Sequence, residues 1–292
     1  MAGFFPTAEA ATAFAFGLER KFAGLKLKQQ QIDGFAMPYL DGGRGEALVL
    51  LHGFGGDKDN FTRMAGRLTK RYRVVIPDLP GFGDAARDAS AHYRMSDQVA
   101  RVHAFCRALK IGRMILGGNS MGGFIAAQYA ATYPGEVAAL WLFAPAGVAD
   151  AQESPIMIRY RETGEMPLVM RSPGDARALI EAVMARPPYI PGFAIKTFGR
   201  RGAADQALHA RILKELLEQS PLLETQFASL PIPTLIVWGA EDKVLNPKAA
   251  ATFQKLFPAS KSILMPGIGH VPMMEAPFRT ARDFLAWMSR AE

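Results

Sequence analysis

The strongest constraint on the fold of this chain is a serine set between closely spaced glycines, Gly118-Asn119-Ser120-Met121-Gly122. An apolar run, residues 114–116, precedes the motif, and an apolar stretch of helical character, residues 124–131, follows it. The pattern G-x-S-x-G between a strand and a helix predicts a tight turn that lifts the serine hydroxyl above the end of a sheet. The alternative is a glycine-rich turn with an incidental serine, so partners for Ser120 must be sought elsewhere in the chain.

Short apolar runs alternate with helical patterns along the rest of the chain. The runs are apolar at nearly every position, as expected of strands buried on both faces of a parallel sheet. Predicted strands and helices in this order favour an α/β fold with a doubly wound, mostly parallel sheet. The predicted strands are 48–51, 74–76, 114–116, 138–143 and 235–238, and the predicted helices are 61–69, 96–109, 121–133, 248–256 and 277–289.

One long segment interrupts the alternation. Residues 148–230 contain helical patterns and many prolines but no strand-like apolar run. Such an insertion predicts a helical cap over the carboxyl ends of the strands, where open α/β sheets bind ligands. We therefore divide the chain into an N-terminal helical extension (1–28), an α/β core (29–147 and 231–292) and this cap. Its flexible methionines fit either an adaptable apolar pocket or ordinary packing; they are Met157, Met166, Met170 and Met184.

A serine nucleophile needs a base to take its proton and an acid to orient that base. His270 lies in a glycine-rich loop between the strand-like residues 262–265 and the last predicted helix. Asp242 follows a buried strand, and Glu241 beside it is an alternative acid that spacing alone does not exclude. The chain order serine, aspartate, histidine is that of the α/β-hydrolase triad. We predict Ser120, Asp242 and His270 as catalytic residues.

The loop after the first predicted strand, His52-Gly53-Phe54-Gly55-Gly56, lies at the same end of the predicted sheet as the serine turn. Acyl transfer creates an oxyanion, which hydrogen-bond donors already in place stabilise. We predict that the backbone N–H groups of Phe54 and Met121, the residue after the nucleophile, form this oxyanion hole. His52 is interpreted as a residue that organises the loop.

Composition excludes several other classes of protein. Half of the 292 residues are hydrophobic, and the net charge of +7 is spread over basic residues interleaved with acidic ones, which argues against nucleic-acid binding. The single cysteine, Cys106, excludes an intramolecular disulfide and a cysteine-based metal cluster. The proposed chemistry needs neither a metal nor an organic cofactor, and we expect none.

The N-terminal segment has apolar residues at helical spacing with basic residues nearby. This pattern favours a helix packed on the protein itself or on a twin subunit in a homodimer. The alternative is a helix that rests on an anionic lipid surface. There is no secretory signal and no apolar run long enough to span a bilayer, so we expect a cytoplasmic protein, with peripheral contact with the inner membrane as the alternative. The apolar positions are Phe14, Leu18, Phe22 and Leu25, and the basic ones are Arg20, Lys21, Lys26 and Lys28.

Several motifs taken together resemble the α/β-hydrolase superfamily from about residue 30 onward. These are residues 51–56, 78–83, 118–123, 238–242 and 269–270. Within that superfamily, residues 61–64, 98–103, 141–147 and 270–275 are similar to bacterial family V esterase/lipases and monoacylglycerol lipases. The resemblance implies a carboxylic ester hydrolase that acts on small esters or lipids through an acyl-enzyme, with a preference for medium to long acyl chains.

Two other functions remain as alternatives. Carbon–carbon hydrolases of aromatic meta-cleavage products share the Gly-Asn-Ser-Met-Gly-Gly motif, but they typically carry tryptophan after the histidine, where this chain has Val271. They also bind their substrate with a cap arginine, for which Arg186 or Arg200 is a candidate. A non-catalytic small-molecule receptor on the same fold is the alternative from another class. Retention of all three triad residue types argues against it.

Overall fold

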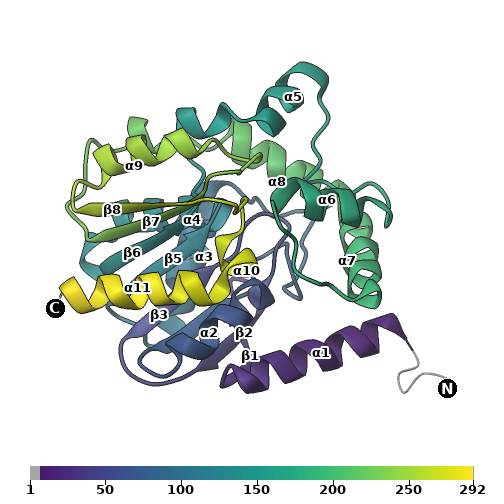
Figure 1. Ribbon diagram of the computed structural model, residues 1–292, viewed down its shortest axis with the longest axis horizontal. Helices are drawn as coiled ribbons and strands as arrows, with labels where there is room; N and C mark the ends of the chain where they lie inside the picture. The colour runs from purple at the N-terminus through teal and green to yellow at the C-terminus, as the bar shows by residue number, and fades with distance from the viewer. Residues whose placement is uncertain (1–6, 292) are drawn as a thin grey trace.

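The computed structural model describes residues 7–291, which form an eight-stranded sheet with helices on both faces (Figure 1). The strand order is β1-β2-β4-β3-β5-β6-β7-β8; β1–β2 and β2–β4 pair antiparallel and all other neighbours pair parallel. The mostly parallel α/β sheet predicted from the sequence is therefore confirmed. The strands are β1 (Leu25–Ile32), β2 (Phe35–Gly42), β3 (Ala47–Leu51), β4 (Arg73–Pro77), β5 (Met114–Asn119), β6 (Val137–Phe143), β7 (Thr234–Gly239) and β8 (Ser260–Met265).

The apolar character of the central strands follows from burial on both faces. In β3, Val49 and Leu51 belong to one hydrophobic cluster, while Leu48 and Leu50 belong to another on the opposite face. The first cluster packs against α3, α4 and α9, and the second against α2 and α11. These helices are α2 (Thr62–Leu68), α3 (Met95–Ala108), α4 (Met121–Thr132), α9 (Ala250–Leu256) and α11 (Pro277–Ala291), with the short α10 (Pro272–Glu275) before the last of them.

The order of the strands places a crevice at the centre of the sheet. After β3 the chain moves outward to β4, and then returns to the other side of β3 to form β5. At such a switch point the loops that follow the two neighbouring strands diverge, which leaves room for a ligand beyond their carboxyl ends. The loop after β3 begins at His52, and the turn after β5 contains Ser120. The fold therefore sets these two segments beside the same crevice.

Four helices lie between β6 and β7, within the segment predicted as the cap, which we call the cap segment (residues 148–230). They cover the carboxyl-end side of the sheet in Figure 1. The division of the chain into core and cap domains stays a prediction. The helices are α5 (Pro155–Thr163), α6 (Asp175–Val183), α7 (Gly192–Ala204) and α8 (Gln206–Glu218).

The N-terminal helix α1 (Ala8–Phe22) is shorter than the extension predicted over 1–28, whose residues 1–6 lie outside the described part. It begins where the hydroxyl of Thr7 accepts a hydrogen bond from the Ala10 N–H, and it ends before Gly24, whose φ of 72° suits a helix C-terminus. Strand β1 then starts at Leu25, so the predicted helical spacing of Leu25 was wrong. Figure 1 shows α1 at the rim, beside α7.

Candidate active site

Ser120 occupies a strained turn at the end of β5. Its φ of 53° and ψ of −113° are unusual for a residue with a side chain. A Cβ on Gly118 would lie 2.2 Å from the carbonyl oxygen of Gly122, and a Cβ on Gly122 would lie 2.2 Å from that of Leu51. Both glycines are thus required by close backbone approach, as the sequence motif predicts.

His270 and Asp242 meet at the carboxyl ends of β7 and β8. His270 Nδ1 lies 2.8 Å from Asp242 Oδ2, and both side chains are buried. The same carboxylate oxygen accepts a hydrogen bond from Trp238 Nε1 at 2.9 Å, while Oδ1 accepts from the N–H groups of Val244 and Leu245 at 2.8 and 3.0 Å. A carboxylate held by four donors has one fixed orientation, and it holds the imidazole with Nε2 free for a second partner.

Glu241, the alternative acid, has a different partner. Its Oε2 accepts an exposed hydrogen bond from the Ile268 N–H at 3.1 Å, in the loop that carries His270. The structure therefore brings Asp242, and not Glu241, to His270.

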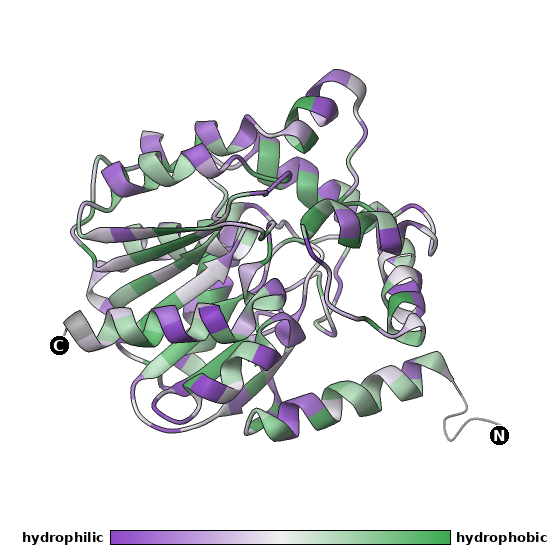
Figure 2. Ribbon diagram, viewed as in Figure 1, coloured by the Kyte–Doolittle hydropathy of each residue, from purple (hydrophilic) through white to green (hydrophobic). Residues whose placement is uncertain are grey.

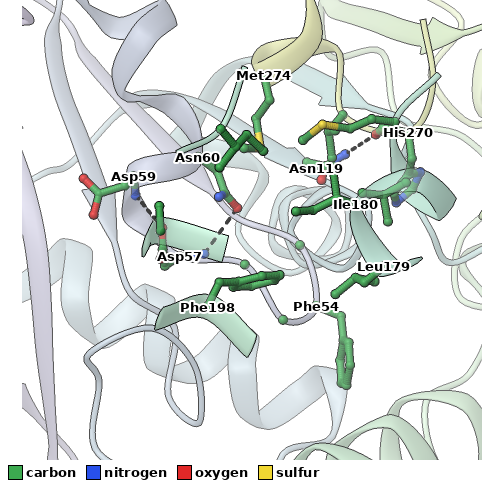
Figure 3. A pocket seen from close by; sticks show the side chains of 18 of the residues that line it. Phe54, Asp57, Asp59, Asn60, Asn119, Leu179, Ile180, Phe198, His270 and Met274 are labelled. Carbon is green, nitrogen blue, oxygen red and sulfur yellow. Dashed lines mark hydrogen bonds between the residues drawn. The ribbon is translucent and has the colours of Figure 1, made fainter. Parts of the chain in front are cut away.

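The His270 loop is tied to both the core and the cap segment. Asn119, next to the serine, donates a hydrogen bond from Nδ2 to the His270 carbonyl at 3.0 Å (Figure 3). The His270 N–H donates to the carbonyl of Val183 in α6 at 2.8 Å. Glu275 accepts from the N–H groups of Gly269, Ala185 and Arg186 at 2.8–2.9 Å. This end of the cap segment is thus fixed to the loop that carries the histidine.

The loop after β3 is organised by His52, as predicted. His52 Nε2 accepts a hydrogen bond from the Leu79 N–H at 2.9 Å, which leaves Nδ1 as the donor to the Gly53 carbonyl at 2.8 Å. Burial lowers the pKa of His52 and keeps it neutral. An added Cβ on Gly53 would lie 3.2 Å from Ser120 Cβ, so the loop passes directly beside the serine. The neutral ring of His52 and the close contact of Gly53 with Ser120 therefore fix the backbone of this loop beside the serine.

Phe54 and Met121 offer backbone N–H groups near the serine. Within residues 7–291, neither group donates a hydrogen bond to another part of the protein. Met121 begins α4, so the positive end of that helix dipole faces the turn. The Phe54 ring packs edge-on against Phe82 and against His209 of α8, at centroid distances of 5.3 and 5.5 Å. These contacts fix the residue whose N–H is a candidate oxyanion donor.

A group of charges around the buried Lys58 follows this loop and was not predicted from the sequence. Lys58 Nζ lies 2.7 Å from carboxylate oxygens of both Asp78 and Asp84, and the Lys58 side chain is 1% exposed. Although burial alone would lower it, the neighbouring carboxylates, Asp78 first, raise the pKa of Lys58 to about 12. Burial, together with Asp59 and Asp78, raises the pKa of Asp57 to about 7. The Asp57 side chain accepts a hydrogen bond from the Asp59 N–H at 2.8 Å, and Asp57 lines a cavity beside Ser120.

Ser120 and His270 line one cavity of about 220 Å³ (Figure 3). The loop after β3 forms part of its lining, and the cap segment contributes mainly apolar side chains, including Leu179, Ile180 and Phe198. Two residues of α1, Thr12 and Phe16, also line it, which was not predicted from the sequence. All four cap methionines belong to hydrophobic clusters, and of these only Met184 also lines the cavity; the other three are Met157, Met166 and Met170.

Other candidate groups lie apart from this cavity. Arg200 pairs with Glu9 on the surface at 2.7 Å, and Arg201, not Arg186 or Arg200, lines the cavity. Burial raises the pKa of Cys106 to about 12, so its thiol is not a nucleophile. Within the described residues, no group of three or more histidine, cysteine, aspartate or glutamate side chains is arranged to hold a metal ion.

Comparisons with known proteins agree with this architecture. Residues 46–277 match the family model of the alpha/beta hydrolase fold. Lipase 1 of Psychrobacter immobilis is 37% identical over 279 residues, which cover 94% of this chain and 87% of that lipase. Monoacylglycerol lipase ABHD6 of Bos taurus is 27% identical over 283 residues, 91% of this chain and 84% of its own. The crystal structure of a bacterial membrane phospholipase A has a TM-score of 0.93 and 38% identity, covering 97% of this chain and 92% of that one. The chain therefore belongs to the α/β-hydrolase fold family.

Proposed function

We propose that this chain hydrolyses carboxylic esters through an acyl-enzyme on Ser120, with His270 as the base and Asp242 as its orienting acid. That the chain is a carboxylic ester hydrolase follows from its family and from relatives named lipase and monoacylglycerol lipase. The observation that carries the residue assignment is the 2.8 Å contact between His270 Nδ1 and Asp242 Oδ2, at the edge of a cavity that Ser120 also lines.

In the proposed mechanism, the Ser120 hydroxyl attacks the ester carbonyl carbon while His270 Nε2 takes its proton. The carbonyl oxygen becomes an oxyanion that accepts hydrogen bonds from the Phe54 and Met121 N–H groups. Each such donor lowers the barrier by about 2.7–4 kcal/mol. His270 then gives the proton to the leaving alkoxide, and a water molecule, activated by the same imidazole, releases the acid. Asp242 stabilises the imidazolium throughout.

The walls of the cavity support a lipid-like ester as substrate. Leu168, Leu179 and Phe198 surround the space beside Ser120 with apolar side chains. Such walls favour hydrocarbon chains over charged groups, because burial of apolar surface contributes about 25 cal/mol per Å². We propose medium- to long-chain esters, including monoacylglycerols, as the substrates.

A comparison of substrates tests this proposal. We expect kcat/KM to rise with acyl length across a series of p-nitrophenyl esters, and monoacylglycerol to be hydrolysed. A dienoate meta-cleavage product should not be turned over at a comparable rate. Turnover of that product in preference to every ester would make the chain a carbon–carbon hydrolase. If no substrate is turned over and a fluorophosphonate probe leaves Ser120 unlabelled in folded protein, the non-catalytic receptor becomes the better assignment.

We also propose that α1 rests on a lipid surface. Leu18 and Phe22 are 40% and 86% exposed, and Phe14, one turn earlier, is 50% exposed. Lys21 and Lys26 are exposed nearby. Figure 2 shows hydrophobic residues along this helix at the rim of the molecule. An exposed apolar stripe flanked by basic groups binds anionic interfaces in the plane of the membrane. No helix within residues 7–291 has the length and apolar character to cross a bilayer.

Sedimentation with vesicles tests the contact of α1 with lipid. The double variant Leu18→Ser, Phe22→Ser should lose most of the binding that the parent chain shows to vesicles of anionic phospholipid, while its hydrolysis of a water-soluble ester is unchanged. Equal binding of variant and parent would contradict the proposal. The alternative occupant of this stripe is a second copy of the chain; in that case the parent sediments as a dimer without lipid, and the variant as a monomer.

A further inference from the structure

A second cavity adjoins the one beside Ser120. It has a volume of about 240 Å³ and lies between α1, the start of α2 and residues 188–194, which include the first turn of α7. The two cavities share part of their lining, including Phe16, Asn60 and Met274. Figure 3 shows Asn60 and Met274 on one side of the first cavity, with Leu179 on the other. The two spaces therefore adjoin along side chains that line both of them, one of which is a flexible methionine.

The volume of the first cavity is small for a pocket that encloses a lipid ester. Pockets that enclose a small-molecule ligand have volumes of about 300–1,000 Å³. The cavity beside Ser120 measures about 220 Å³ and the second about 240 Å³, so neither reaches that range alone, whereas the two together do. An ester with a long chain needs space beyond the first cavity, and the second is adjacent to it.

The chemistry of the second cavity suits a hydrocarbon chain. Most of its lining is apolar, including Ala15 of α1, Ile190 of the segment before α7 and Phe193 of α7. At its rim Arg63 and Glu19 form an ion pair at 2.9 Å, with both side chains partly exposed. Asp59, Asn60 and Thr12 also line the space, so its walls are mostly apolar with a few polar groups. Such walls match a hydrocarbon chain that ends in a polar group or in solvent.

Helix α1 is a fixed wall of this space. The hydroxyl of Thr12 donates a hydrogen bond to the α1 carbonyl of Ala8 and lies 3.1 Å from the hydroxyl of Thr197 in α7, and this contact is buried. Arg20 donates two hydrogen bonds to the carboxylate of Asp59, which is 4% exposed. Buried bonds at both ends hold the helix against the cap segment and against the loop behind the oxyanion site, so the cavity has defined sides.

We propose that the second cavity binds a hydrocarbon chain of the ester whose scissile bond lies at Ser120, with Phe16 and Met274 bordering the passage between the two spaces. This inference rests on the ester hydrolysis proposed above. It makes Ala15, Phe16 and Phe193 specificity-determining residues for chain length. The chain that enters is either the acyl chain or the chain of the alcohol, and both have the same chemistry.

The test uses Ala15→Trp, which fills the second cavity from α1, and Phe193→Trp, which narrows it from α7. Neither residue lines the cavity that contains Ser120. Ala13→Trp is the matched control, since Ala13 is exposed on the same helix and lines neither cavity. The kcat/KM of each variant is measured with p-nitrophenyl esters from acetate to palmitate and with acetate esters of alcohols from ethanol to hexadecanol.

We expect both cavity variants to lose about tenfold or more in kcat/KM for the longest chains of one series, while acetyl and butyryl esters of small alcohols are hydrolysed as by the parent. The series in which the loss appears identifies the chain that enters. A loss equal at all lengths, a loss shared by Ala13→Trp, or no loss would overturn the inference. Absence of hydrolysis of every ester in the parent would instead contradict the proposed function itself.

Discussion

Replacement of Ser120 by alanine is expected to reduce kcat for p-nitrophenyl butyrate by about five to six orders of magnitude, because removal of a serine nucleophile costs about that much in a triad hydrolase. The fold should be preserved. Within the described residues the Ser120 hydroxyl makes no hydrogen bond to the rest of the protein. The strained φ of 53° is as unfavourable for alanine as for serine. Circular dichroism and thermal unfolding should therefore match those of the parent.

The control is Ser289→Ala, which removes an exposed hydroxyl in α11 that bonds only to the Ala286 carbonyl. It should hydrolyse esters and react with a fluorophosphonate probe as the parent does, whereas Ser120→Ala should not be labelled. If Ser120→Ala kept its activity to within about tenfold, the nucleophile would have to be another residue.

The second large effect is expected for Asp242→Asn. An asparagine keeps the shape of the side chain but can present an NH₂ donor to His270 Nδ1, which favours the wrong tautomer and removes the charge that stabilises the imidazolium. In a Ser-His-Asp triad this exchange lowers kcat by about 10⁴. The hydrogen bonds from Trp238, Val244 and Leu245 hold the side chain in place, so KM should change little.

Glu241→Gln is the matched control for the aspartate. Its carboxylate bonds to the Ile268 N–H, and an amide oxygen can accept the same bond. We expect kcat within about threefold of the parent, as for a substitution of an exposed side chain away from special features. A larger loss of kcat for Glu241→Gln than for Asp242→Asn would show that Glu241, and not Asp242, is the acid that orients His270.

The core of the fold and the placement of the site were predictable because each depends on a local pattern. Gly118 and Gly122 have no space for a Cβ, so the close turn around Ser120 leaves a mark in the sequence itself. The central strands are buried on both faces and are therefore apolar at nearly every residue. The order of the strands then brings the turn after β5 next to the loop after β3.

The hairpin of β1 and β2 escaped prediction for a physical reason. Residues 26–31 of β1 are mostly exposed and polar, as an edge strand with one neighbour can be, so no apolar run marks the strand. The signal that could have revealed it is the turn Asp33-Gly34, whose φ angles of 47° and 83° fit a two-residue hairpin.

The role of α1 in the pocket and the charges around Lys58 depend on pairs far apart in the sequence. Arg20 and Asp59 are 39 residues apart, and Thr12 and Thr197 are 185 apart. Nothing local distinguishes Arg20 from the other basic residues near it, so sequence alone predicted a helix with a basic side and not a wall of the site. Only the three-dimensional arrangement joins it to Asp59.

The hydrogen bonds that join the cap segment to the histidine loop have a consequence for how the protein can be altered. Val183 and Glu275 clamp one margin of the site, which also carries the groups that move the proton. The opposite margin, α1 against α7, carries none of the proposed triad side chains; it is joined by the contact of Thr12 with Thr197 and by the ion pair of Glu9 with Arg200. The residues proposed to carry out the reaction therefore lie on one side of the crevice, and the α1 and α7 residues proposed to select chain length lie on the other side. Substitutions in α1 can therefore change the range of substrates while the side that carries the proposed catalytic residues is left unaltered.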